Sequence, residues 1–324
     1  MPTMDQLVRR FHRLGRRPAP VAPTSPPYLS KPGALWIDRP DWLDTLARKR
    51  WSGVFSEELA GRIFRFVRDG YLVIEQAVPA TLIDSLNDEI EGFWTAPPAG
   101  MLIETFKPDH RIKLIPPVLE YRDQSKLIDI YPFSATARAA IANPAAMQFL
   151  RAIFDARPKA FQSLSFWYGS EQDIHKDTAY VKVDSGAMRL AATWLALEDV
   201  EPGTGELEYY IGSHRAPEFM FAGESKWMDH KPDEHPAFLR SLHADAERFG
   251  HPRGSFLAKK GDVLIWHADL AHGGARITKP GRTRRSLVTH FTSENDEPYY
   301  RRFSRTAALV TSTCVFASQH VDVR

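Results

Sequence analysis

The sequence predicts an α+β fold, in which a jelly-roll barrel follows a helical layer and carries an inserted lid. Three observations support this prediction. Apolar residues recur at helical spacing as far as about residue 160, and beyond it apolar and polar residues alternate with a period of two. The long stretch 213–260, between two predicted strands, contains a helical pattern of its own. Many short strands after a helical front end are typical of a barrel or sandwich with helices on one side.

The composition describes a globular chain without bulk charge. Of the 324 residues, 43% are hydrophobic and 25% are charged, which excludes a disordered or fibrous protein. Lysine and arginine number 42 against 40 acidic residues, so the net charge of +2 gives no general attraction for nucleic acid. The length allows two domains of about 150 residues each, or one large barrel with extensions.

The single cysteine, Cys314, indicates the compartment. It can form neither an internal disulfide nor, by itself, a thiolate metal site, which favours a reducing environment. No apolar run approaches the roughly 18 residues of a membrane-spanning helix. The N-terminal residues also lack the apolar core of a secretory signal. We therefore expect a cytoplasmic protein.

Residues 1–37 are predicted to form a basic, proline-rich arm. Six prolines in the stretch 18–33 remove backbone donors and fix φ, so this part is expected to be extended. The basic segment 1–17 fits either a short amphipathic helix for an acidic partner or anionic lipid, or a solvated arm. The domain proper is expected over 38–300, with a C-terminal tail over 301–324.

The helical front is expected over 38–160. Between Ser56 and Gly70 the apolar positions fall on one helical face, with Ser56 as the N-cap and Gly70 as the terminator. A short buried strand, 71–74, follows, and a second helical pattern covers 82–93. A further helix pair completes this layer.

The jelly-roll core is expected over 161–295, with turn signals between its strands. The predicted strands are 161–168, 174–183, 188–198, 206–211, 262–267 and 284–292.

The lid insertion 213–260 is expected to hold a helix that starts near Pro236 and closes before Gly250. Its apolar residues either cover an organic substrate or pack the insertion onto the barrel. These residues are Phe219, Met220, Phe221, Trp227 and Met228.

His175 and Asp177 stand two residues apart on the predicted strand 174–183, so their side chains are expected to project from one face. A neutral imidazole and a carboxylate from one strand, completed by a distant imidazole, form a facial triad that leaves three positions of an octahedral Fe(II) open. This pair alone is a weak signal, because chance produces it often.

Further motifs follow in a fixed order. They are Trp194-Leu195-Ala196-Leu197-Glu198-Asp199, Gly205-Glu206-Leu207, Gly212-Ser213-His214, Gly261-Asp262-Val263, His272-Gly273 and Arg284. In this order the motifs resemble the phytanoyl-CoA dioxygenase (PhyH) family of Fe(II)- and 2-oxoglutarate-dependent oxygenases, over roughly residues 60 to 295. The resemblance implies a single catalytic domain over 38–300, whose barrel is a cupin-like double-stranded β-helix.

The resemblance also implies a site. His175, Asp177 and His272 would be the catalytic iron ligands, and Arg284 would bind the far carboxylate of 2-oxoglutarate. Arginine suits this task because its planar fork binds both carboxylate oxygens. Fe(II), 2-oxoglutarate and O2 are the implied cofactor and cosubstrates.

Two neighbours, Arg282 and Arg285, compete with Arg284 for this assignment. Alternate residues of a strand share one face. If Arg284 points into the barrel, Ser286 and His290 should therefore accompany it, and Arg285 should point outward.

One position departs from the family. A serine often stands two residues after the distal histidine, where its hydroxyl assists the cosubstrate, and this chain has Gly274 there. Either Ser286 supplies that hydroxyl, or binding of 2-oxoglutarate rests more on the arginine.

A second pair, His267 and Asp269, lies only three residues before His272. One strand and its turn would have to encircle the ion, so this pair is the weaker candidate. We expect His267 to end a core strand and Asp269 to cap the following turn.

Other polar residues have simpler explanations. His230 and His235 are expected in a solvated loop of the lid, and His214 is expected to stabilise a turn while its ring remains able to face the cavity. The stretch 276–285 holds five basic residues and no acid. It fits either recognition of an anionic substrate, or one arginine for the cosubstrate with the others on the surface.

The predicted function is oxidation of an unactivated C–H bond of a small organic metabolite, with release of succinate and CO2. The carboxylate of Asp177 favours hydroxylation or desaturation over halogenation, since halogenases of this kind have a small residue there. Two rival functions stay open: a non-catalytic jelly-roll module that binds a metabolite or sugar, and a cupin-like metal hydrolase or isomerase. The substrate and the oligomeric state are left open.

Overall fold

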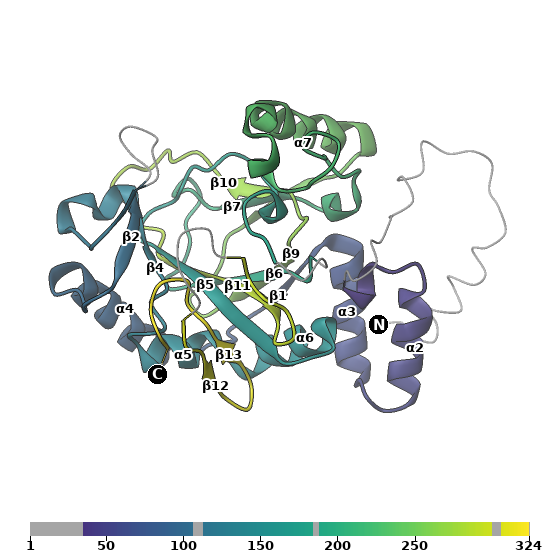
Figure 1. Cartoon of the computed structure of the whole chain (residues 1–324), viewed down its shortest axis with the longest axis horizontal. Helices are drawn as coiled ribbons and strands as arrows, with labels where there is room; N and C mark the ends of the chain where they lie inside the picture. The colour runs from purple at the N-terminus through teal and green to yellow at the C-terminus, as the bar shows by residue number, and fades with distance from the viewer. Residues whose placement is uncertain (1–34, 106–112, 184–187, 300–305, 324) are drawn as a thin grey trace.

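The computed structural model describes residues 35–105, 113–183, 188–299 and 306–323. Two β-sheets share one set of buried side chains, and helices cover the other face of the larger sheet (Figure 1). The predicted α+β class with a jelly-roll core is confirmed.

The main sheet has the strand order β1-β9-β6-β11-β5-β4-β2-β3, and β13 also pairs with β5. The small sheet has the order β10-β7-β8. The strands are β1 Tyr71–Ile74, β2 Leu102–Thr105, β3 Lys113–Ile115, β4 Ser125–Ile128, β5 Pro158–Phe166, β6 Ala191–Ala196, β7 Leu207–Tyr210, β8 Arg253–Phe256, β9 Val263–His267, β10 His272–Gly274, β11 Ser286–Ser293, β12 Leu309–Val310 and β13 Val315–Phe316.

The helices lie mainly before β5, as predicted. The α-helices are α2 Trp42–Trp51, α3 Glu57–Asp69, α4 Ala80–Thr95, α5 Ala135–Ile141, α6 Pro144–Phe154 and α7 His235–Phe249. Short 3-10 helices are η1 Trp36–Asp38, η2 Leu119–Gln124, η3 Asp177–Ala179, η4 Ser213–Arg215, η5 Met228–His230 and η6 Pro232–Glu234. Within the described residues, no helix combines the length and the apolar character needed to cross a membrane.

The predicted caps explain where α3 begins and ends. The hydroxyl of Ser56 accepts a hydrogen bond from the Leu59 amide at 3.2 Å, which satisfies one of the free donors of the first turn. Gly70 ends the helix with a φ of 85°, a left-handed conformation that glycine adopts without steric cost. The chain then enters β1 directly, as the sequence predicts.

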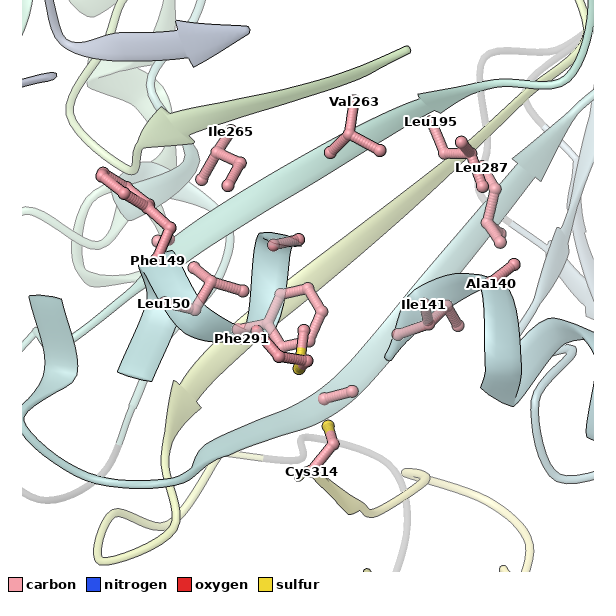
Figure 2. Close-up of a cluster of buried hydrophobic side chains, with 14 of the residues drawn as sticks. Ala140, Ile141, Phe149, Leu150, Leu195, Val263, Ile265, Leu287, Phe291 and Cys314 are labelled. Carbon is pink, nitrogen blue, oxygen red and sulfur yellow. The ribbon is translucent and has the colours of Figure 1, made fainter. Parts of the chain in front are cut away.

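Strands β6, β9 and β11 separate two buried regions. Leu195, Ile265 and Phe291 point toward helices α5 and α6, in the cluster that Figure 2 shows. Trp194 and Trp266, next to two of them in sequence, belong to the cluster between the two sheets. The period of two thus sends alternate residues to the helical core and to the barrel interior.

The insertion 213–260 is built around α7, which starts and ends as predicted. Figure 1 shows α7 beside the small sheet, and β8, which ends the insertion, pairs with β7. Phe219 and Phe221 lie 5.6 and 5.4 Å from the ring of Phe238 in α7. Phe221 also belongs to a buried cluster with Ile174 and Ala271, outside the insertion, so it packs the insertion onto the barrel, which is the second of the two alternatives for the apolar lid residues.

The predicted strand 174–183 is wrong. His175 alone pairs with the small sheet, through an isolated bridge to His272, and Asp177–Ala179 is a 3-10 helix. The backbone turns because the Asp177 carbonyl accepts from the amides of Tyr180 and Val181 at 2.9 and 2.8 Å. The metal ligands therefore approach each other from a bridge and a turn, not from one strand face.

The expected helical front also contains strands. β2, β3 and β4 form the far edge of the main sheet. Each is only three or four residues long, so none repeats an alternating pattern often enough to be recognised.

The chain ends extend the packed region beyond the expected 38–300. Leu35, Trp36 and Ile37 are buried, and β13 adds to the main sheet beside β5 with Cys314 buried next to it. Most of the predicted arm, residues 1–34, lies outside the described residues.

Candidate metal centre

The two predicted histidine ligands face each other across a backbone bridge. The His175 amide donates to the His272 carbonyl at 2.8 Å, and the His272 amide donates back to the His175 carbonyl at 2.9 Å. Their ring centroids are 4.5 Å apart. β10 thus holds the distal histidine against a segment 97 positions earlier in the sequence.

Asp177 completes the group from the first turn of η3. Its Oδ1 lies 3.8 Å from Nε2 of His175 and 3.6 Å from Nε2 of His272. One ligand atom from each of the three side chains lies within 4.8 Å of the others, and all three residues are buried. The structure therefore brings the predicted triad together.

Backbone carbonyls fix which ring nitrogens face the site. Nδ1 of His175 donates to the Asp173 carbonyl, and Nδ1 of His272 donates to the Leu270 carbonyl, both at 2.8 Å. A carbonyl only accepts, so each Nδ1 carries the proton and each Nε2 keeps a free lone pair. Burial, followed by repulsion from His272, lowers the pKa of His175 to about 3, so this ring is neutral near pH 7.

Asp177 supplies the negative charge. Burial opposes its ionisation, but attraction to His272 and His290 in their protonated forms outweighs burial and holds the pKa of this carboxyl below its usual range. Its Oδ2 accepts a hydrogen bond from Nε1 of Trp266 at 2.8 Å. Two imidazole nitrogens and one carboxylate oxygen on one side of an ion are the donor set of mononuclear non-haem Fe(II) sites, so these residues fit such a metal.

Arg284 lies beside this group, just before β11. Only 4% of the residue is exposed, and its guanidinium lies 5.8 Å from the ring of Phe166 and 5.4 Å from that of Trp194. Nη1 donates to Oγ of Ser286 at 2.9 Å, while Nε has no hydrogen-bond partner and no described carboxylate forms an ion pair with this arginine. Burial lowers its pKa to about 10. A buried cation with no ion-pair partner among the described residues fits an anionic ligand.

The competing arginines point elsewhere. Arg285 faces outward and stacks on Trp167, with its guanidinium carbon 3.9 Å from the ring centroid. Arg282 is exposed and pairs with Glu201 at 2.6 Å. The predicted alternation of the strand is confirmed, since Ser286 is buried next to Arg284. Because these two arginines point away from the cavity, they do not support the prediction of an anionic substrate.

Gly274 is explained by a close backbone approach. A Cβ at this position would lie 3.0 Å from the Glu171 amide nitrogen and 3.0 Å from Oγ of Ser170. Ser170 and Gln172 line the same cavity as the triad. The Ser170 hydroxyl thus lies close to the position where a side chain at residue 274 would begin, and the spacing of the motifs did not predict this neighbour.

Two other contacts to Asp177 were not predicted. The alternation of β11 placed His290 inside the barrel but gave it no partner, and the indole of Trp266 was not considered. Both lie beside Oδ2 of Asp177. The alternation of β9 could have identified Trp266, because it faces opposite to His267.

His267 ends β9, as predicted, on the helical side. Its Nε2 lies 3.1 Å from Oδ1 of Asp38, and with His214 it lines a separate cavity of about 440 Å³ between η1, α2 and α3. His214, bonded to the Val67 carbonyl at 3.0 Å, does not face the triad cavity. Neither histidine belongs to the metal centre.

Two minor predictions are wrong. The side chain of Asp269 does not cap its turn but accepts from Thr178 and from Lys226, both at 2.8 Å. His235 is not in a solvated loop, because it begins α7 and its Nε2 lies 2.6 Å from the Tyr180 hydroxyl. Both side chains have partners far along the chain, which sequence spacing does not reveal.

The fold and the site define a jelly-roll protein with a buried His-Asp-His metal centre beside an unpaired arginine. The chain belongs to the phytanoyl-CoA dioxygenase (PhyH) family, whose model matches residues 66–286. Membership indicates iron- and 2-oxoglutarate-dependent oxygenase chemistry. No curated protein matches the sequence.

Several solved structures share the fold at low sequence identity. The α-ketoglutarate-dependent epimerase SnoN of nogalamycin biosynthesis has 15% identity and a TM-score of 0.55, over 74% of this chain and 84% of its own. Iron-bound EctD from S. alaskensis has 19% identity and a TM-score of 0.53, over 74% and 76%. The non-haem monooxygenase ThoJ has 16% identity and a TM-score of 0.51, over 80% and 87%. SnoN has been crystallised with Fe3+ and α-ketoglutarate, and EctD with 2-oxoglutarate.

Proposed function

We propose that this protein is an Fe(II)- and 2-oxoglutarate-dependent dioxygenase that hydroxylates a C–H bond of a small organic molecule. The observation that carries the proposal is the buried group of His175, Asp177 and His272 beside Arg284, a buried cation without a carboxylate partner among the described residues. A metal site alone would fit many activities. The unpaired arginine adds a place for a dicarboxylate cosubstrate.

Each residue has one task in this proposal. His175, Asp177 and His272 would hold Fe(II), and this donor set is typical of iron sites that bind a cosubstrate and O2. Arg284, assisted by Ser286, binds the distal carboxylate of 2-oxoglutarate. When bound, iron and 2-oxoglutarate supply the oxidising chemistry with O2, and the cosubstrate leaves as succinate and CO2. The apolar walls of the barrel exclude water from the reaction.

The carboxylate of Asp177 sets the outcome of the reaction. With Fe(II) bound, it would occupy the position that a halide would need, so hydroxylation or desaturation is the expected result. The family name does not define the substrate, because no residue described here selects an acyl thioester. SnoN and EctD, with nogalamycin RO and 5-hydroxyectoine in their crystals, illustrate how different the ligands on this fold are.

The test is an anaerobic reconstitution with Fe(II) and 2-oxoglutarate, followed by addition of O2 and a broad panel of small metabolites. We expect succinate formation that requires iron and disappears in His175→Ala. Arg282→Ala, which changes an exposed arginine on the same segment, should form succinate like the wild type. Metal-dependent hydrolysis or isomerisation without succinate, or metabolite binding without turnover, would overturn the proposal.

A further inference from the structure

His290 is a buried histidine whose ring makes no hydrogen bond with the described residues. It lies in β11, is 3% exposed, and lines the cavity of the metal centre. Neither Nδ1 nor Nε2 has a hydrogen-bond partner. A buried polar group costs stability when it is unsatisfied, so most such groups in native proteins have a partner or a function.

The carboxylate of Asp177 lies close to this ring. Nε2 of His290 lies 3.5 Å from Oδ2 of Asp177. On the same oxygen, Trp266 donates its indole N–H at 2.8 Å. The other oxygen, Oδ1, is the one that faces the two histidine ligands. The two oxygens of this carboxylate therefore have different surroundings.

This difference matters because the groups that hold the side chain of Asp177 in place differ from those that hold the two histidine ligands. The rings of His175 and His272 are each held by a backbone carbonyl. Within the described residues, no backbone amide donates to the carboxylate of Asp177, whose one hydrogen bond comes from Trp266, with His290 beside the same oxygen. A carboxylate held only at one point can rotate and offer both oxygens to a metal.

We propose that His290 is a positioning residue for the metal centre. Its Nε2–H donates to Oδ2 of Asp177, and with Trp266 it restricts the carboxylate to ligation through Oδ1. A shortening of roughly half an ångström from the observed separation gives an ordinary hydrogen bond. The inference rests on the proposed metal-dependent function, but it concerns how the site is built and not which substrate is oxidised.

Three substitutions of His290 distinguish the role of Nε2 from that of Nδ1. In His290→Gln the side-chain amide nitrogen reaches about as far as Nε2 and restores a donor to Oδ2. In His290→Asn the amide nitrogen reaches only as far as Nδ1, and His290→Phe keeps the ring without any donor. Thr289→Val is the matched control, because this buried polar residue is next in the same strand and faces the opposite side.

The readouts need no turnover. Anaerobic titration gives the Fe(II) affinity, and the visible absorption of the Co(II)-substituted protein reports the number and geometry of the ligands. We expect His290→Phe and His290→Asn to lose roughly 10- to 100-fold in metal affinity and to change the Co(II) spectrum. His290→Gln should retain most of the affinity and the wild-type spectrum, and Thr289→Val should leave both unchanged.

Each outcome decides one question. Wild-type affinity and spectrum in His290→Phe, or a His290→Gln protein as impaired as His290→Phe, overturns the positioning role of His290. A wild-type protein that binds neither metal overturns the proposed function itself. Thermal unfolding of the metal-free variants identifies any that fail to fold, and His290→Asn then carries the comparison with His290→Gln.

Discussion

Arg284 carries a positive charge in a buried place where no described carboxylate lies at ion-pair distance, although Glu198 and Glu206 attract it from farther away. Aromatic rings and one hydroxyl surround the guanidinium, and these replace only part of its hydration. Such a residue lowers the stability of the empty protein and strengthens binding of an anion that arrives later. Binding and stability are thus opposed at this position.

Replacing Arg284 by methionine should reveal this opposition. We expect the free energy of unfolding of the metal-free protein to rise by roughly 1 kcal/mol or more, because a buried charge is removed while its volume is largely kept. Binding of 2-oxoglutarate should be lost. Denaturant unfolding and ligand titration measure the two effects.

Arg282→Met is the control for this substitution, because Arg282 is exposed and paired with Glu201. It should change stability by less than about 0.5 kcal/mol. A loss of stability in Arg284→Met would contradict the view that its charge is uncompensated.

At the scale of elements, the approach of β10 to the segment before η3 decides whether the two histidine ligands meet. Gly273 follows His272 in β10 and lies against the backbone of residues 172–174. A Cβ on Gly273 would lie 2.6 Å from the Gln172 carbonyl oxygen, closer than any ordinary contact. The backbones can approach this closely only because residue 273 has no side chain.

Gly273→Ala should therefore separate His272 from His175 and weaken metal binding by at least roughly tenfold, since ligand geometry is fixed by the supporting residues. Metal titration under anaerobic conditions measures the loss. Gly92→Ala in α4 is the matched control, since a Cβ there meets nothing within 4 Å. That change should leave metal affinity unaltered and stabilise the protein by roughly 0.5 to 1 kcal/mol.

The C-terminal segment is held to the rest of the protein through contacts with a buried residue that can bind a proton. Asp129 is fully buried and accepts hydrogen bonds from the Ser163 amide at 2.7 Å and from the Ser318 hydroxyl at 2.8 Å. His320 lies 3.5 Å from the same carboxylate. Burial raises the pKa of Asp129 to about 6 and lowers that of His320 to about 4.

These shifts predict opposite pH dependences for two variants. Asp129 binds a proton more readily in the native state than in the unfolded chain, so its contribution to stability grows as pH falls below about 6. His320 binds a proton less readily in the native state, so its contribution declines as pH falls from 6.5 toward 4. The two effects nearly cancel in the wild type.

Denaturant unfolding between pH 7 and pH 4 checks this pair. Relative to wild type, Asp129→Asn should lose on the order of 2 kcal/mol as the pH falls, and His320→Gln should gain a similar amount. Asparagine is suitable because residue 129 has a φ of 47°, which asparagine tolerates. If the free energy of unfolding of both variants changed with pH in the same way as that of the wild type, the proposed cancellation would be refuted.

At the scale of the whole molecule, the sequence predicted the kind of fold and the residues of the metal centre. It predicted less well which elements and contacts hold those residues in place. Ordered motifs placed His175, Asp177 and His272 in one site, and the period of two correctly sent Arg284 inward and Arg285 outward. These predictions depend on local spacing and on a family resemblance, which a single sequence contains.

What the sequence did not predict depends on contacts between distant segments. The predicted strand around His175 proved to be one bridge and a turn, because its partner strand, β10, has only three residues. The bond from Trp266 to Asp177 joins residues 89 positions apart. The two-residue strand β13 forms by pairing with β5, a strand far from it in the sequence.

Metal binding should stabilise the whole molecule, because the ligands come from segments that unfolding separates. We expect Co(II) in 100-fold excess over its Kd to add about 2.7 kcal/mol to the free energy of unfolding. Thermal unfolding with and without Co(II), and after addition of a chelator, measures this effect. His175→Ala should show no response to the metal, and an equal response in that variant would place the binding site elsewhere.

The alternation of β6, β9 and β11 also has a practical meaning for anyone wishing to redesign the enzyme. In these three strands the even-numbered apolar positions belong to the cluster between the sheets, where Trp194 and Val288 line the cavity of the metal centre, and Leu195 and Leu287 face the helices. A mutant library confined to Trp194 and Val288 would vary what the pocket accepts without repacking the helical core and without touching the contacts to Asp177. Substitutions from the two sets should combine with little epistasis.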